Sequence, residues 1–320
     1  METRSPRRPE QVSAEFRCPN TSEFSVTRIA QAIGGVVMLA CVIGPANAQK
    51  WGPLAERVTF PSADGHTTLI GYLYEPPPKH AAQVPAVVMM HGRGGAYSSL
   101  AKGRYDASTL SQRHQMWGQF WSRQGYYALM VDGFGPRGYG QGFPQGSYEQ
   151  RPAELNEVTV RPLDAYGALT WLRKRGDVLP NGVGLHGWSN GGSATLAAMA
   201  LGTSFAPAPG QGFAAAIAFY PACGLKGQFE SGLKPYAPVR VFHGSADKEV
   251  SFRRCRDLVE RGNAAGGDIQ INIYPGAVHG FDDPSPSRQS AKANANALAD
   301  STQEAQRFFA RYLPGAGPGR

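Results

Sequence analysis

The chain has 320 residues, of which 42% are hydrophobic and only 18% are charged, so it can bury a large core and its composition excludes an intrinsically disordered protein. The 40 glycines and 25 prolines follow no repeating period, which excludes collagen-like and linker proteins and favours a compact domain with many tight loops. The net charge is +8 at pH 7, but the sequence contains no run of five or more Lys/Arg and no nucleic-acid-binding motif. We therefore expect a basic surface that favours anionic substrates or cell-envelope polymers, and no nucleic-acid partner.

The N-terminal region is typical of a secretory signal peptide. Residues 29–44 form an apolar run (IAQAIGGVVMLACVIG) that follows Arg28 and precedes the small residues Ala-Asn-Ala at 46–48. This run is shorter than the roughly 20 residues that a membrane-spanning helix needs. We expect cleavage after Ala48 and export to the periplasm or the medium, without stable membrane association after cleavage.

Alternatives to this interpretation are a retained anchor, a buried helix, or lipid attachment at Cys41. The 27 residues before Arg28 are polar, which is unusual because a signal peptide normally begins near its positive flank. Our hypothesis is that translation starts near Val26, so that about the first 25 residues are not part of the protein. Residues 1–48 are thus expected to be an N-terminal extension and signal peptide, followed by one domain over 49–320.

Beyond Gln49, apolar runs that are typical of strands alternate with helical patterns. The predicted strands are Arg57–Phe60, Thr68–Tyr74, Pro85–Met90, Tyr126–Val131, Gly182–Gly187, Phe213–Tyr220, Val239–His243 and Ile269–Tyr274. The predicted helices are Leu110–Gln124, Pro162–Arg175, Gly192–Leu201, Phe252–Ala264 and Ala291–Tyr312. Such alternation predicts an α/β protein with a mostly parallel central sheet and helices on both faces.

The motif that carries the strongest chemical signal is GWSNGG at 187–192, which fits G-x-S-x-G. The bare pentapeptide also occurs by chance, but here a predicted strand precedes it and a helix of small residues follows. Glycines on both sides of Ser189 allow a sharp strand-to-helix turn that presents the hydroxyl. Ser189 is therefore a candidate nucleophile, which requires a base and an orienting acid.

Two further residues follow in the order that this type of site requires, nucleophile, acid and histidine. Asp247 lies 58 positions after Ser189, and His279 lies 32 positions after Asp247, each just beyond a predicted strand. The carboxyl ends of parallel strands meet at one edge of the sheet, so we expect all three side chains to lie together. Asp282 and Asp283 are alternative acids, but they follow the histidine and do not follow a strand of their own.

The chain resembles the dienelactone hydrolase family of α/β-hydrolases, and the resemblance covers most of Val58–Phe309. The resemblance is carried by DGHTTLIGYLYEP at Asp64–Pro76, HGRGG at His91–Gly95, GWSNGG, HGSADKEV and the segment G-x-x-H-G-F. It implies the α/β-hydrolase fold, a Ser189 nucleophile, a His279 general base and an orienting Asp247. It also implies an oxyanion hole formed by the backbone N–H groups of Asn190 and Arg93, and no cofactor.

The sequence departs from the family pattern at two positions. The family's namesake enzymes have a cysteine nucleophile where this chain has Ser189, and a glutamate where it has Gly92. These differences argue against dienelactone itself as the substrate. They favour a serine esterase that forms an acyl-enzyme on Ser189 and hydrolyses it with water activated by His279.

Candidate substrate-pocket residues are Arg137, Tyr139 and Trp188. Arg137 lies in the irregular stretch after the strand that ends at Val131. The aromatic residues of this stretch, Tyr139, Phe143 and Tyr148, are candidates for a lid or a pocket wall. Arg137 could bind a substrate carboxylate, or form a structural ion pair with a carboxylate such as Asp164. No spacing typical of a zinc site is present, so no metal is expected.

Cys223 and Cys255 remain after removal of the signal peptide. Export permits disulfides, and the loop after one predicted strand would meet the helix after the next, so we expect these two residues to be bonded. Two separate buried thiols are the alternative.

We interpret the chain as an exported serine hydrolase that cleaves small-molecule carboxylic esters without a cofactor. One alternative is a serine peptidase or acyl-peptide hydrolase related to the prolyl oligopeptidase group, which shares the Gly-x-Ser-x-Gly-Gly motif. The other is a non-catalytic α/β-hydrolase used for binding. The sequence leaves the oligomeric state open.

Overall fold

The computed structural model describes residues 52–78 and 82–315. The predicted signal peptide, its cleavage after Ala48 and the proposed start near Val26 therefore lie outside the described residues. The described residues belong to one compact unit, Gln49–Arg320. Within them, no helix is both long enough and apolar enough to cross a membrane.

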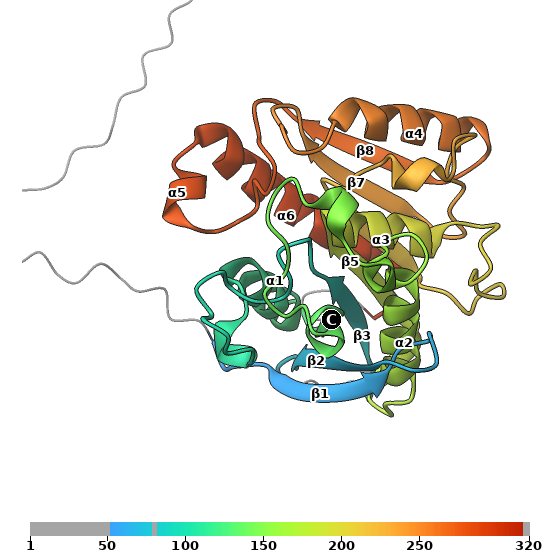
Figure 1. The fold of residues 1–320 in the computed structure, drawn as a ribbon. Helices are drawn as coiled ribbons and strands as arrows, with labels where there is room; N and C mark the ends of the chain where they lie inside the picture. The colour runs from blue at the N-terminus through green and yellow to red at the C-terminus, as the bar shows by residue number, and fades with distance from the viewer. Residues whose placement is uncertain (1–51, 79–81, 316–320) are drawn as a thin grey trace, which may run out of the picture. The chain divides into compact units, whose positions relative to one another are not determined.

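A sheet of eight strands forms the centre of the fold (Figure 1). The strands are β1 (Glu56–Pro61), β2 (Thr68–Tyr74), β3 (Val84–Met90), β4 (Tyr127–Asp132), β5 (Val178–Trp188), β6 (Ala215–Phe219), β7 (Val239–Gly244) and β8 (Ile269–Tyr274). Their order is β1-β2-β4-β3-β5-β6-β7-β8. The β1–β2 and β2–β4 pairs are antiparallel, and the remaining pairs are parallel. The predicted mostly parallel sheet is confirmed.

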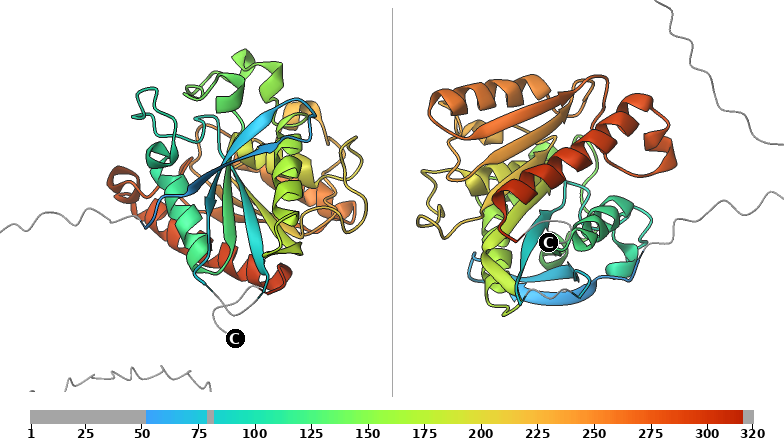
Figure 2. Two further views of the ribbon diagram at one scale, coloured as in Figure 1. Left: turned by 90° about the horizontal axis from the view of Figure 1, so that it is seen from below. Right: turned by 180° about the vertical axis from the view of Figure 1, so that it is seen from behind.

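Helices cover both faces of this sheet, as predicted. They are α1 (Gln112–Arg123), α2 (Arg161–Arg173), α3 (Asn190–Met199), α4 (Phe252–Ala264), α5 (Pro286–Gln289) and α6 (Lys292–Tyr312). One hydrophobic cluster joins α2, α3 and α4 to one face, and another joins α1 and α6 to the opposite face. In the view from behind, α6 crosses the back of the sheet near α1 (Figure 2).

The two clusters share β3, whose seven residues are all buried. Val88 and Met90 face one cluster, and Val87 and Met89 face the other. A strand packed on both faces has no polar side to present, which explains its continuous apolar sequence.

The structure differs from the sequence prediction in a few elements. β5 begins at Val178 rather than at the predicted Gly182. Pro180 and Asn181 interrupt the apolar pattern, so the sequence does not show where the strand starts. The short helix α5 was not predicted, since four residues are too few to show a helical period.

Strand register brings the functional loops together. Met90 of β3 is paired with Gly187 of β5, and Trp188 with Phe219 of β6. β7 and β8 end in register at the next positions along the sheet, with Gly244 paired to Tyr274. The loops after these five strands therefore leave the same edge of the sheet.

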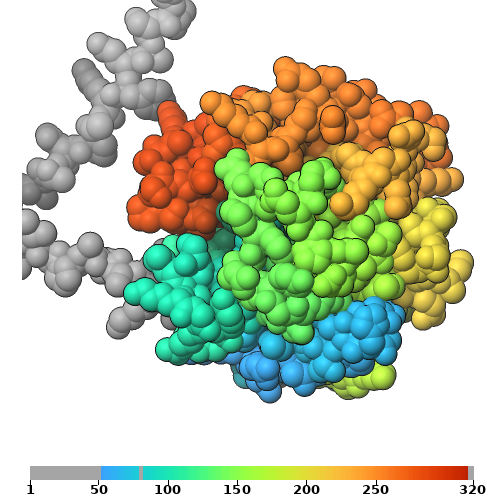
Figure 3. Space-filling view, in the orientation of Figure 1, coloured from blue at the N-terminus to red at the C-terminus, as the bar shows by residue number. Residues whose placement is uncertain are grey.

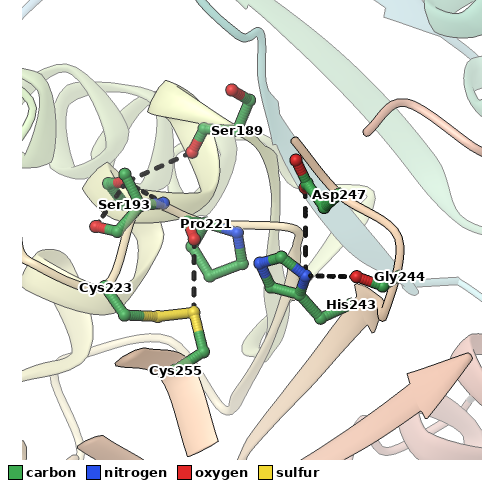
Figure 4. Close-up of a disulfide and its surroundings, with 9 residues drawn as sticks. Ser189, Ser193, Pro221, Cys223, His243, Gly244, Asp247 and Cys255 are labelled. Carbon is green, nitrogen blue, oxygen red and sulfur yellow. Dashed lines mark hydrogen bonds and ion pairs between the residues drawn. A yellow bond between two sulfur atoms is a disulfide. The ribbon is translucent and has the colours of Figure 1, made fainter. Parts of the chain in front are cut away.

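Cys223 and Cys255 are joined by a disulfide in the structure (Figure 4). Their Cα atoms lie 4.9 Å apart, and the two residues are 32 positions apart in the sequence. The bond links the loop after β6 to the first turn of α4, next to the segment that carries Asp247.

Candidate active site

Ser189 lies at the turn between β5 and α3, with a backbone φ of +52° and ψ of −116°. Positive φ is unfavourable for a residue with a Cβ atom, so the surrounding structure must hold this turn in place. A Cβ atom at Gly187 would clash with the Gly191 carbonyl, and one at Gly191 would clash with the carbonyls of Met90 and His91. The glycines of the motif are therefore required by close backbone packing.

The structure brings Ser189, His279 and Asp247 together, as predicted from their order in the chain. His279 Nε2 lies 3.0 Å from Ser189 Oγ, and His279 Nδ1 lies 2.8 Å from Asp247 Oδ2. The side chain of His279 is 13% exposed and that of Asp247 is fully buried. This is a continuous hydrogen-bonded chain from a hydroxyl to a buried carboxylate.

Asp247 is held as an anion by its surroundings. Its Oδ1 accepts backbone N–H bonds from Glu249 and Val250, at 2.8 and 3.0 Å. Burial alone would raise its pKa, but the hydrogen bond from His279 and these N–H groups hold the pKa of the carboxyl below its usual value. An ionised Asp247 favours the Nδ1–H form of His279, which leaves Nε2 free to accept the Ser189 proton.

Asp282, which the sequence offered as an alternative acid, has a different environment. It is fully buried and accepts the indole N–H groups of Trp117 and Trp188, at 2.9 and 2.8 Å, and the hydroxyl of Tyr220. Arg113 Nε lies 3.1 Å from the same carboxylate. Asp282 thus connects the His279 loop to the strand that carries the nucleophile.

Tyr220 also contacts the histidine directly. Its ring centroid lies 4.6 Å from that of His279, so the ring forms a wall beside the imidazole. The sequence did not predict that Tyr220 contacts His279, nor which side chains bind Asp282. The only sequence feature that pointed to this cluster was the position of Asp282, three residues after His279.

The two residues expected to form an oxyanion hole lie beside Ser189. Asn190 is the first residue of α3, so its backbone N–H has no acceptor within the helix. Arg93 follows Gly92, where an added Cβ atom would lie 3.3 Å from Ser189 Cβ. The Arg93 side chain pairs with Glu249 at 2.9 Å, and Glu249 lies 3.8 Å from His279 Nε2.

A cavity of about 630 Å³ opens next to Ser189, Asn190 and Arg93. Its walls come from residues 145–157, from the loop 222–227 after β6, and from residues 248–254 before and within α4. In Figure 3 the green segment between β4 and α2 lies on the same face as the orange β7–α4 region. The cavity is large enough for a small-molecule ester.

Arg137, Tyr139 and Trp188 do not line this cavity, whereas Tyr148, a candidate wall residue, does. Arg137 donates to Asp64 and Asp164 and its side chain is 7% exposed, so it forms the structural ion pair that was the alternative interpretation. Tyr139 lies outside the cavity, where its hydroxyl donates to Glu154 at 3.1 Å. Trp188 is fully buried, and its indole N–H donates to Asp282 instead of pointing into the cavity.

Four histidines besides His279 are buried in the fold, and one of them, His243, has its Nδ1 atom 3.9 Å from Asp247 Oδ2. His91, His114, His186 and His243 are each at most 3% exposed. Burial lowers the pKa of each, for His114 to about 4, so they are neutral at pH 7. In the part of the chain that the structure describes, no three His, Cys, Asp or Glu side chains form a group that could hold a metal ion.

Comparison with known proteins identifies the family. Residues 69–313, more than three quarters of the chain, match the model of the dienelactone hydrolase family. Among solved structures, esterase 2 of the planctomycete Thermogutta terrifontis, phosphorylated by paraoxon, is 20% identical with a TM-score of 0.58, and covers 83% of this chain and 97% of its own. The propionate-bound form is 20% identical with a TM-score of 0.55, over 84% of this chain and 97% of that one. These structures share the fold, and the family match shows that the chain belongs to the dienelactone hydrolase family and is a carboxylic ester hydrolase of the α/β-hydrolase fold.

Proposed function

We propose that this protein hydrolyses carboxylic esters through an acyl-enzyme on Ser189, with His279 as general base and Asp247 as the orienting acid. The observation that carries the proposal is the hydrogen-bonded chain of 3.0 Å from Ser189 Oγ to His279 Nε2 and 2.8 Å from His279 Nδ1 to Asp247. Serine alone is a weak nucleophile, and this arrangement supplies the proton acceptor that it needs.

The chemical sequence follows from these contacts. His279 Nε2 takes the Ser189 proton as Oγ attacks the carbonyl carbon, and Asp247 stabilises the imidazolium that forms. The negative charge on the former carbonyl oxygen is bound by the N–H groups of Asn190 and Arg93. The C–O bond to the alcohol then breaks, and the alcohol leaves with the proton from His279.

Hydrolysis of the acyl-enzyme repeats these steps with water as the nucleophile. His279 Nε2 takes a proton from the water, whose oxygen attacks the acyl carbon, and the same N–H groups bind the new oxyanion. The Ser189–acyl bond breaks, the proton returns to Ser189 Oγ, and the carboxylic acid is released. No cofactor takes part in either half of this reaction.

The experiment that tests this proposal is turnover of 4-nitrophenyl acetate by matched variants. Ser189→Ala and His279→Ala should each lower kcat by about 10³-fold or more, as removal of a triad member does. Ser122→Ala is the control, since Ser122 lies near the end of α1 and donates to the Glu75 carbonyl, outside the cavity. Retention of wild-type turnover by Ser189→Ala would reject the nucleophile.

The cavity also supports a preference for anionic esters. Its lining has more cationic than anionic side chains, namely Arg93, Arg151, Lys226, Lys248 and Arg254 against Glu157 and Glu249. Arg93 pairs with Glu249. The other four cations have no carboxylate within 4.0 Å among the residues described. An excess of cations beside a cavity attracts a negatively charged substrate.

A pair of esters that differ only in terminal charge tests this preference. The mono-4-nitrophenyl ester of adipic acid should have a kcat/KM about tenfold above that of 4-nitrophenyl hexanoate, and added salt should lower the ratio. Arg254→Gln should lower the ratio, while Lys174→Gln, at the C-terminal end of α2 and outside the cavity, should not. A ratio of one or less in the wild type would reject the preference.

We further propose that the enzyme is exported, with cleavage after Ala48, and that it contains the Cys223–Cys255 disulfide in its native compartment. The disulfide in the structure supports this assignment, because such bonds persist in oxidising compartments. N-terminal sequencing of the native protein should begin at Gln49. Peptide mapping without reductant should recover the two cysteines in one linked peptide pair, and two free thiols would contradict the assignment.

A further inference from the structure

A buried arginine contacts both segments of the proposed oxyanion hole. Arg161 is the first residue of α2 and is 0% exposed. Its Nη1 donates to the carbonyl of His91 at 2.8 Å and to Oδ1 of Asn190 at 2.6 Å. These are the only hydrogen bonds of its guanidinium group among the described residues, because Nε and Nη2 have no partner there.

The two acceptors belong to segments that are far apart in the sequence. His91 directly follows β3 and precedes Gly92 and Arg93, while Asn190 directly follows the nucleophile. The segments pack in direct contact, since a Cβ atom at Gly191 would clash with the His91 carbonyl. One side-chain nitrogen therefore bridges the two segments whose backbone N–H groups would bind the oxyanion.

The energetic cost of this arrangement indicates a role beyond stability. A buried ion with two unpartnered nitrogens is usually less favourable than an apolar side chain of the same size. Burial lowers the pKa of the Arg161 guanidinium to about 10, and Asp164 and Glu157 oppose that shift, so the group stays charged at neutral pH. The face of the Phe134 ring, 4.9 Å from Arg161 Cζ, is the other favourable contact.

We propose that Arg161 is a positioning residue for the oxyanion hole. It holds the His91–Arg93 segment and the start of α3 at the separation that a tetrahedral oxyanion requires, and its fixed charge lies behind that site. This proposal rests on the Ser189 mechanism, but it concerns the transition state and not the nucleophile. It therefore predicts a loss in kcat with little change in KM.

Arg161→Met and Arg161→Lys are the test variants, measured with 4-nitrophenyl acetate. Arg161→Met should lower kcat by about 10- to 100-fold, less than the direct loss of an oxyanion-hole donor. KM should stay within threefold of the wild type. The inhibition constant for a trifluoromethyl ketone, which forms a tetrahedral adduct on serine, should rise by the same factor as kcat falls. Arg161→Lys should recover part of the loss.

Arg137→Met is the matched control. Arg137 is also buried and pairs with Asp64 and Asp164, but it forms no hydrogen bond with His91 or Asn190. This variant should lower the melting temperature while leaving kcat and the ketone affinity within twofold. An equal loss of kcat in Arg137→Met would show a general effect of destabilisation and would overturn the proposal.

Asn190→Ala tests the same contact from its other side, and it serves if Arg161→Met does not fold. It removes the Oδ1 acceptor and leaves the backbone N–H of residue 190 in place, so it should lower kcat severalfold at constant KM. Unchanged kcat in both Asn190→Ala and Arg161→Lys would overturn the positioning role. Covalent labelling by a fluorophosphonate separates the two proposals: labelled Ser189 with unaffected Arg161 variants rejects only the positioning role, and labelling that persists in Ser189→Ala rejects the mechanism itself.

Discussion

Removal of the Cys223–Cys255 disulfide should destabilise the enzyme by an amount that follows from the loop it closes. The double variant Cys223→Ala/Cys255→Ala lacks the bond that closes a loop with a sequence separation of 32. In the chain-entropy model, a loop of this size contributes about 4 kcal/mol to the free energy of unfolding. For a domain of this size, that corresponds to a fall in melting temperature of about 7–15 °C.

Differential scanning calorimetry of the wild type and the double variant, both without reductant, measures this difference. Dithiothreitol should move the wild type to the variant's melting temperature and leave the variant unchanged. Because Cys223 lines the cavity and its loop carries Lys226, KM for an anionic ester should also rise in the variant. Equal melting temperatures of wild type and variant, with no response to dithiothreitol, would show that this disulfide does not stabilise the fold.

Three further predictions concern buried polar groups. Asp282→Asn should lower the free energy of unfolding by about 3 kcal/mol, measured by urea denaturation, because an amide cannot accept all the donors of Trp117, Trp188 and Tyr220; a change below 0.5 kcal/mol would contradict it. Stability should fall as the pH drops from about 6.5 towards 4, since burial lowers the pKa of His114 from 6.5 to about 4 and the unfolded chain then binds more protons; His114→Gln should flatten that slope in urea titrations at several pH values. Asp247→Asn should lower kcat by up to about 10⁴-fold with ester substrates at neutral pH, and a loss under tenfold would exclude Asp247 as the orienting acid.

The sequence was sufficient to predict the sheet and the residues that meet at its carboxyl edge. A short continuous apolar run such as Val84–Met90 is typical of a strand that is buried on both faces of a sheet. Once the strands are placed, parallel order alone brings Ser189, Asp247 and His279 to one edge. Local patterns and topology carried this part of the prediction.

The contacts of the predicted pocket residues could not be predicted from their positions in the sequence. Arg137 and Trp188 were placed near the cavity by position in the chain, but each side chain turns towards a buried carboxylate instead. Which partner a side chain finds depends on packing between distant segments, as with Arg161 and Asn190, 29 positions apart. Such pairs leave no periodic signal in a single sequence.

Acylation of Ser189 during turnover can be tested by locating the residue that a serine-directed reagent modifies. The purified enzyme is treated with a fluorophosphonate, digested and analysed by tandem mass spectrometry. We expect one adduct per chain on Ser189, loss of esterase activity in proportion to labelling, and no adduct in Ser189→Ala. An adduct on another residue, or full activity in the completely labelled enzyme, would contradict it.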